Sequence, residues 1–178
     1  MCLFCSGDTK NVSHIDCRGC KKIKKIPIIP GLVILDCSGC TVLKKIPIIP
    51  GLKKLHCEGC TALTEIPIIP GLELLDCEGC TALTEIPIIP GLVILDCSGC
   101  TALKEIPIIP GLVSLNCTNT NCYELPIIPG LFKLDCNSCI FLGKIPIIKG
   151  LVSLSCRGCK NIREIPVIPG LKKLWCIE

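Results

Sequence analysis

A 20-residue motif, LxxLxCxGCxxLxxIPIIPG, recurs along this chain with little variation, and the repetition limits the folds that are open to it. The 178 residues contain about eight copies between Val12 and Gly170, with partial copies at residues 1–11 and 171–178. A regular period of this length is typical of a solenoid, in which each repeat packs on the next. We therefore predict one repeat domain over residues 1–178, with copies that begin at Val12, Leu32, Leu52, Leu72, Leu92, Leu112, Leu131 and Leu151.

Each repeat has two parts with different backbone requirements. The LxxLxC part predicts a short strand with alternate side chains buried, so that in one copy Leu55 and Cys57 point inward while His56 and Glu58 point outward. Successive strands would stack as a parallel sheet. The IPIIPG part contains two prolines, which cannot donate backbone hydrogen bonds, so we expect an extended, polyproline-like path and little or no helix. Because only 3% of the residues are aromatic, the core must consist of Leu, Ile, Pro and Cys.

The spacing of Leu52, Leu55, Cys57, Cys60 and Leu63 matches the signature LxxLxLxxN/CxL, with one extra residue before the last leucine. The chain therefore resembles the leucine-rich-repeat family over essentially its whole length. The segment LDCSGCTALKEIP is similar to repeats of plant immune receptors, and IPxIP is similar to the LPxLP of bacterial effectors. The cysteine usage resembles that of cysteine-rich leucine-rich-repeat proteins of giant viruses of amoebae. The resemblance implies a curved solenoid with its strands on the concave face, where members of the family usually bind partners.

Nineteen cysteines are a density typical of a secreted disulfide scaffold, but other features argue against secretion. The count is odd, and the N-terminal segment MCLFCSGDTKNVSH lacks the basic start, apolar run and small-residue site of a secretion signal. No apolar run approaches the roughly 20 residues that cross a bilayer. We expect an intracellular, cytoplasmic protein, in a host cell or a virion, without membrane contact and with mostly reduced thiols.

Most repeats carry a Cys-x-x-Cys pair, which in isolation suggests zinc or redox chemistry. A zinc site needs four converging ligands, whereas this regular spacing places the thiols in two parallel ladders. We interpret both cysteines as core residues, the second turned toward backbone groups of the loop, and we expect no metal and no cofactor. The alternative is disulfide formation between neighbouring cysteines of one ladder, whose Cα atoms would lie about 5 Å apart. The pairs are Cys17/Cys20, Cys37/Cys40, Cys57/Cys60, Cys77/Cys80, Cys97/Cys100, Cys136/Cys139 and Cys156/Cys159.

The outward strand positions form the predicted partner-binding face, and the middle of that face is acidic. A solvated face, in which aspartate recurs through gene duplication, is the alternative. We call this set the concave stripe: Asp36, His56, Glu58, Asp76, Glu78, Asp96, Asn116 and Asp135.

Catalysis is not expected from this sequence. It contains two histidines, His14 and His56, and no Ser/His/Asp arrangement, phosphate-binding loop or cofactor fingerprint. The one catalytic arrangement that the sequence suggests is a Cys57 nucleophile activated by His56. However, the Cys57 thiol should point into the core. We predict that the protein is not an enzyme.

The middle isoleucine of each IPIIP segment should point outward on the convex side, where a contiguous apolar row normally marks an interaction surface. A row that is merely tolerated is the alternative. Both ends also lack an obvious cap, with Leu3 and Cys5 in strand register and the last residues, from Trp175, in a strand unit. Open sheet edges would invite pairing with another copy. We call this set the isoleucine ridge: Ile48, Ile68, Ile88, Ile108, Ile127 and Ile147.

Charge is segregated along the chain, with +6 over residues 1–60, −6 over 61–120 and +4 over 121–178. Nucleic acid is not expected as a partner, because no aromatic residues are interleaved with the basic ones and the acidic middle repels a polyanion. The favoured hypothesis is a non-enzymatic module that binds a protein partner through the concave stripe. The alternatives are a structural protein of a virion or filament, which forms homo-oligomers through its ends or the isoleucine ridge, and a metal-binding thiol protein.

Overall fold

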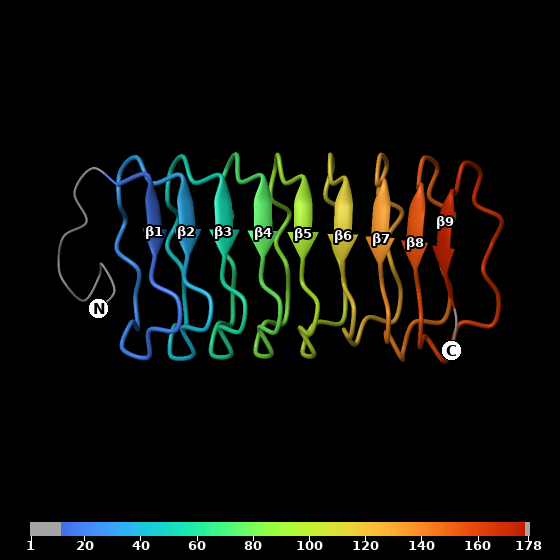
Figure 1. Cartoon of the computed structure of the whole chain (residues 1–178), viewed down its shortest axis with the longest axis horizontal. Helices are drawn as coiled ribbons and strands as arrows, with labels where there is room; N and C mark the ends of the chain where they lie inside the picture. Colours follow the sequence, from blue (N-terminus) through green and yellow to red (C-terminus); the bar gives the residue numbers. More distant parts are fainter. Residues whose placement is uncertain (1–11, 177–178) are drawn as a thin grey trace.

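The computed structural model of the protein describes residues 12–176. They form one continuous parallel sheet whose strands follow one another in chain order (Figure 1). The prediction of a parallel-stranded repeat solenoid is confirmed, and the described residues contain no helix. None of them therefore forms a helix with the length and hydrophobicity that a bilayer crossing requires. The strands, paired in chain order, are β1 (His14–Asp16), β2 (Ile34–Asp36), β3 (Lys54–His56), β4 (Leu74–Asp76), β5 (Ile94–Asp96), β6 (Ser114–Asn116), β7 (Lys133–Asp135), β8 (Ser153–Ser155) and β9 (Lys173–Trp175).

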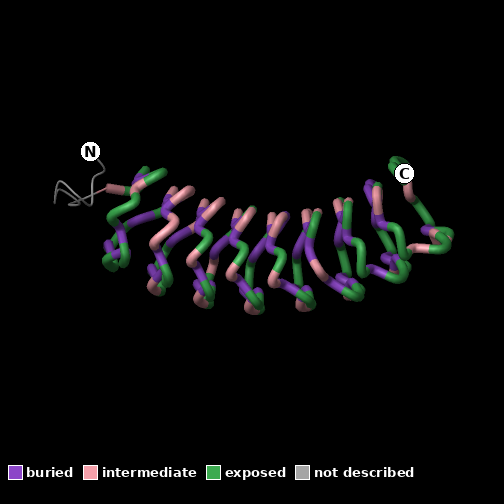
Figure 2. Tube along the Cα trace, turned by 90° about the horizontal axis from the view of Figure 1, so that it is seen from below, coloured by how far each residue is buried: buried purple, intermediate pink, exposed green. Residues whose placement is uncertain are grey.

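The stack bends into an arc, and the strands lie on its concave side (Figures 1 and 2). The proline-rich segments return along the convex side in an extended path without regular secondary structure. Equivalent residues of neighbouring repeats face each other, as Leu55 faces Leu35 and Leu75. This register places chemically equivalent side chains in straight rows along the solenoid.

The core lies between the strands and the return segments and repeats the same residues in every layer. In one repeat the buried side chains are Leu72, Leu75, Cys77, Cys80, Leu83, Ile86 and Ile89, each at most 5% exposed. The aromatic side chains of the described residues stay outside, with Tyr123 and Phe132 both more than half exposed. The space between strand and return segment is filled by Leu, Ile and Cys, as predicted from the low aromatic content. The prediction that proline also contributes to the core is wrong: the prolines of the return segments are half-buried or exposed, as Pro67 and Pro70 are.

The two cysteines of a repeat donate hydrogen bonds in opposite directions along the stack. Sγ of Cys57 lies 3.3 Å from the carbonyl oxygen of Asp76 in the next repeat. Sγ of Cys80 lies 3.1 Å from the carbonyl oxygen of Cys57 in the preceding repeat, and this second contact recurs at 2.9–3.2 Å from Cys40 to Cys159. The thiols therefore connect each repeat to both neighbours, in the inward positions that the sequence predicted.

Burial also sets the ionisation of these thiols. It raises the pKa of the Cys97 thiol well above its ordinary value of 9.0, and it raises the pKa of Cys122 to about 11. Because only a thiolate reacts readily, Cys97 and Cys122 are protonated and unreactive at neutral pH. In the second ladder the hydrogen bond with Cys117 instead lowers the pKa of Cys139 to about 6.

A residue with a positive φ angle occupies the turn after each of the strands β1 to β8, and it is usually glycine. Gly79 and Gly99 have φ angles of 66° and 69°. They stack so closely that a Cβ atom on Gly99 would lie 3.4 Å from the backbone of Gly79. Asn119 and Ser138 occupy the same turn with φ angles of 55° and 56°, which is strained for residues with a side chain.

The shortened repeat that begins at Leu112 keeps the register of the sheet. β6 and β7 pair with Leu115 opposite Leu134, so the missing residue is absorbed in the loop. Thr120 stands where other repeats have the second cysteine, and its Oγ1 donates to the carbonyl oxygen of Cys117 at 2.9 Å. Thr120 thus donates to the carbonyl of its own repeat, which also accepts from Cys139, whereas a cysteine at this position donates to the carbonyl of the preceding repeat.

Candidate functional site

The outward residues at the C-terminal ends of β2 to β7 form a continuous row on the concave face. Their Cα partners run from one strand to the next, as Asp76 pairs with His56 on one side and Asp96 on the other. Strands in a sheet lie about 4.8 Å apart, so each side chain shields its neighbours from solvent. Most members are half-buried as a result, while Glu78 is exposed. The structure thus brings the predicted concave stripe together as one surface.

Three aspartates of the stripe, Asp36, Asp76 and Asp96, accept a hydrogen bond from the backbone N–H two residues later, which stabilises the turns that follow their strands. Oδ1 of Asp36 accepts hydrogen bonds from the backbone N–H of Ser38 at 3.1 Å and from its hydroxyl at 2.7 Å. Asp96 and Ser98 repeat the arrangement at 2.9 and 2.6 Å. Ser98 is only 7% exposed as a consequence. This turn role was missed in the sequence reasoning, although the Asp-x-Ser spacing is the signal that indicates it.

Basic side chains neutralise both ends of the stripe. Arg18 lies 2.7 Å from Asp16 and 3.5 Å from Asp36, and its hydrogen bond lowers the pKa of Asp16 to about 2. At the other end, Lys133 lies 2.7 Å from Asp135. Within residues 12–176 the carboxylates in the middle have no lysine or arginine ion-pair partner, and these are Glu58, Asp76, Glu78 and Asp96. The negative potential of the concave face is therefore concentrated over β3 to β5.

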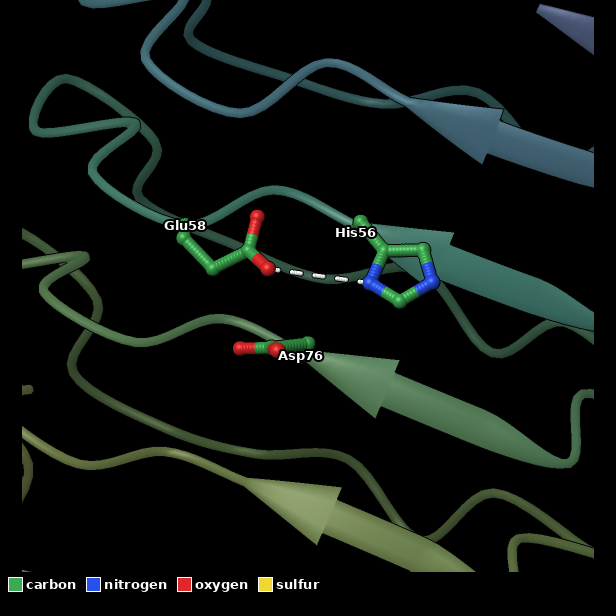
Figure 3. A group of neighbouring side chains, drawn as sticks. All are labelled: His56, Glu58 and Asp76. Carbon is green, nitrogen blue, oxygen red and sulfur yellow. Dashed lines mark ion pairs between the residues drawn. The ribbon is translucent and has the colours of Figure 1, made fainter. Parts of the chain in front are cut away.

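One cluster within this middle region combines an imidazole with two carboxylates (Figure 3). Nδ1 of His56 lies 3.6 Å from Oε1 of Glu58, and one ligand atom each from His56, Glu58 and Asp76 lie within 4.8 Å of one another. The Ser38 hydroxyl donates a hydrogen bond to Glu58. Burial, followed by the adjacent Glu58 carboxyl, raises the pKa of Asp76 to about 7.

This cluster is the one group of potential metal ligands found among the described residues, and it contains no cysteine. The sequence reasoning placed its three members on the partner-binding face but did not group them. The available signal was a histidine in register with the recurrent aspartates, with a glutamate two residues later.

The isoleucine ridge points to solvent, as predicted. Ile48 and Ile68 are 53% and 51% exposed, and Ile127 is 58% exposed, while the flanking Ile46 and Ile49 are at most 4% exposed. The outward orientation is confirmed for the whole set, Ile48, Ile68, Ile88, Ile108, Ile127 and Ile147. Whether this surface mediates self-association stays a prediction.

Two other predicted features have a definite position. Cys57 is fully buried, and its hydrogen bond with Cys80, together with burial, raises the pKa of its thiol well above the ordinary value. It is thus a poor nucleophile, and His56 points away from it to the concave surface. The strand register predicted for Leu3 and Cys5 lies outside the described residues.

No family model matches the chain, and no curated protein is similar enough to match it. The functional interpretation therefore depends on the geometry of the two surfaces.

Proposed function

We propose that the protein is a non-enzymatic interaction module whose concave stripe binds a basic segment of a partner protein. The observation that carries this proposal is the row of carboxylates over β3 to β5, all but Glu78 half-buried, and without lysine or arginine ion-pair partners among the described residues. Ionised carboxyl groups this close repel one another, which, after burial, contributes to the raised pKa of Asp76, and a cationic partner would relieve that repulsion. The strands that carry these residues lie on the inner side of the arc (Figure 2).

Charge complementarity defines the class of partner. Facing potentials of opposite sign speed association and exclude wrong partners. Lysine and arginine side chains that reach carboxylates about 4.8 Å apart form charge-assisted hydrogen bonds, which are stronger than neutral ones. The segment that fits is therefore rich in Lys or Arg and contacts several strands at once.

The resemblance to leucine-rich repeats supports the same proposal. The confirmed parallel solenoid and the thiols that donate to loop carbonyls at the Asn/Cys position agree with that family's signature. Buried thiols such as that of Cys97, whose pKa is raised by burial, also suit a reducing intracellular compartment. Membership of the family and an intracellular location are parts of this proposal.

Affinity capture with matched variants tests the proposal. Immobilised wild-type protein should retain a basic protein from its native cells, and salt should weaken that retention. The double variant Asp76→Asn with Asp96→Asn should lose it, and Asn116 shows that the stripe accommodates asparagine. The double variant Ile68→Glu with Ile108→Glu is the control and should retain it. Capture that survives neutralisation of the stripe but not substitution of the ridge contradicts the proposal.

Self-assembly through the isoleucine ridge is a second candidate, favoured by the exposure of these side chains. Isoleucines about half exposed at every repeat form a continuous apolar line, which a second copy could cover. Light scattering over a concentration series tests this candidate. A particle that remains at the monomer mass of 19.1 kDa at high concentration contradicts it.

A further inference from the structure

We propose that His56, Glu58 and Asp76 form a binding site for one divalent transition-metal ion, with Zn²⁺ as the cation that suits them best. The proposal does not rest on the partner-binding function, although all three side chains also belong to the concave stripe. It also differs from the thiol-based metal binding considered from the sequence, since no cysteine belongs to the site.

The backbone brings the three ligands to one point. His56 and Asp76 pair across β3 and β4, and Glu58 lies two residues after His56 (Figure 3). Ligands at zinc bond lengths of about 2.0–2.2 Å lie about 3.3 Å apart in a tetrahedral site. The Nδ1–Oε1 distance of 3.6 Å between His56 and Glu58 is already close to this value. The full spread of 4.8 Å closes with small rotations of half-buried side chains.

Neighbouring groups hold the carboxylates in a ligating arrangement. The Ser38 hydroxyl, whose one proton is shared between Oδ1 of Asp36 and Oε2 of Glu58, lies against Glu58, while Oε1 faces the imidazole. The backbone N–H of Glu78 donates to Oδ1 of Asp76 at 3.2 Å, and a hydrogen bond between the carboxyl groups of Asp76 and Glu58 keeps them together. Such outer contacts orient metal ligands and strengthen binding. The side chains of His56 and Glu58 are 29% and 32% exposed, so solvent can complete the coordination.

The combination occurs at one position of the described solenoid. His56 stands in register with Asp36 and Asp76, and it alone places an imidazole among the carboxylates of the stripe. In the repeats of Asp36 and Asp96 the aspartate instead accepts a hydrogen bond from the serine two residues later. An imidazole with two carboxylates favours Zn²⁺ over Mg²⁺ and Ca²⁺, which prefer sites made only of oxygen.

Nuclear magnetic resonance of the two histidine side chains tests the site directly. The chain contains only His14 and His56, so each imidazole gives an assignable signal in the full-length, reduced protein. On titration with ZnCl₂, the His56 signal should shift and saturate at one equivalent, while the His14 signal stays in place. Observing the imidazole also separates this site from any zinc held by thiols. No shift of His56 up to millimolar Zn²⁺, or parallel shifts of both histidines, would overturn the proposal.

Matched variants test whether the carboxylates of Glu58 and Asp76 are ligands of the metal ion. Asp76→Asn and Glu58→Ser should each weaken the zinc-dependent shift of His56 at least about tenfold. Both replacements occur naturally at equivalent positions, as Asn116 and Ser98, so the fold accommodates them. Asp96→Asn, in the same stripe but outside the cluster, should bind zinc like the wild type. Equal affinity of the wild type and the Asp76→Asn variant would contradict the site.

Discussion

Replacement of Cys80 by alanine tests whether the second cysteine ladder stabilises the solenoid. Cys80 is fully buried, and its thiol lies 3.1 Å from the carbonyl oxygen of Cys57. The change removes a group about the size of a methylene, whose transfer from water contributes about 0.8 kcal/mol. The cavity adds about 0.5 kcal/mol, and the lost hydrogen bond adds about 0.5–1 kcal/mol. The carbonyl keeps the backbone N–H of Cys60 at 3.2 Å, so no buried acceptor is left unsatisfied. We therefore expect the free energy of unfolding to fall by about 2 kcal/mol.

Urea unfolding under reducing conditions, followed by circular dichroism, measures this loss. Cys176→Ala is the matched control, because Cys176 is exposed and its replacement should change stability by less than about 0.5 kcal/mol. Cys80→Ser should cost less than Cys80→Ala, since Thr120 shows that a hydroxyl can satisfy a loop carbonyl at this place. An alanine variant as stable as the Cys176→Ala control, or a serine variant less stable than the alanine variant, would refute the reasoning.

Three further predictions concern the turn, the core and the thiols, and urea unfolding measures each. Gly99→Ala should lower the free energy of unfolding by about 1–2 kcal/mol, because the turn needs a positive φ and Gly79 lies close. Ser138→Gly should raise the free energy of unfolding by about 1 kcal/mol, because it relieves the strain of a positive φ at serine. A change of the opposite sign in either variant contradicts backbone strain at these turns. Leu75→Ala should lower the free energy of unfolding by about 2–5 kcal/mol and Ile68→Ala by under about 1 kcal/mol, because only the leucine is fully buried. Equal losses of stability would show that the isoleucine ridge is covered. Stability should fall as pH rises above about 9, because Cys97 and Cys122 retain thiol protons in the folded state that the unfolded chain loses. The lowered pKa of Cys139 acts in the opposite direction, but only below about pH 9. A flat profile up to about pH 11 counts against the raised pKa values of the buried thiols.

The sequence predicted the features that depend on the period of the repeat. Alternation within LxxLxC placed Leu55 and Cys57 inside, and the spacing of IPIIP placed Ile48 outside, because both follow from local backbone geometry. A strictly recurrent motif also fixed the parallel register, since a shift of one residue would expose every leucine.

Features that depend on contacts between individual side chains were not predictable in this way. The direction of each thiol hydrogen bond is set by the rotamer of the cysteine and the position of a carbonyl in another repeat. The repeat motif places Ser38, Asp36 and Glu58 on one face of the sheet, but it does not show that the Ser38 hydroxyl contacts both carboxyl groups. The convergence of His56 with Asp76 required the register of two strands and the orientation of both side chains.

Site-specific photo-crosslinking in the native cells tests the central claim, that the concave stripe is the partner-binding surface, most directly. A photoreactive residue placed at Glu78 lies on the concave face, and one placed at Ile88 lies on the ridge; both positions are exposed. The account predicts an adduct of the Glu78 probe with a basic protein and no such adduct from Ile88. Adducts formed only by the Ile88 probe, and only with further copies of this chain, would contradict it in favour of self-assembly.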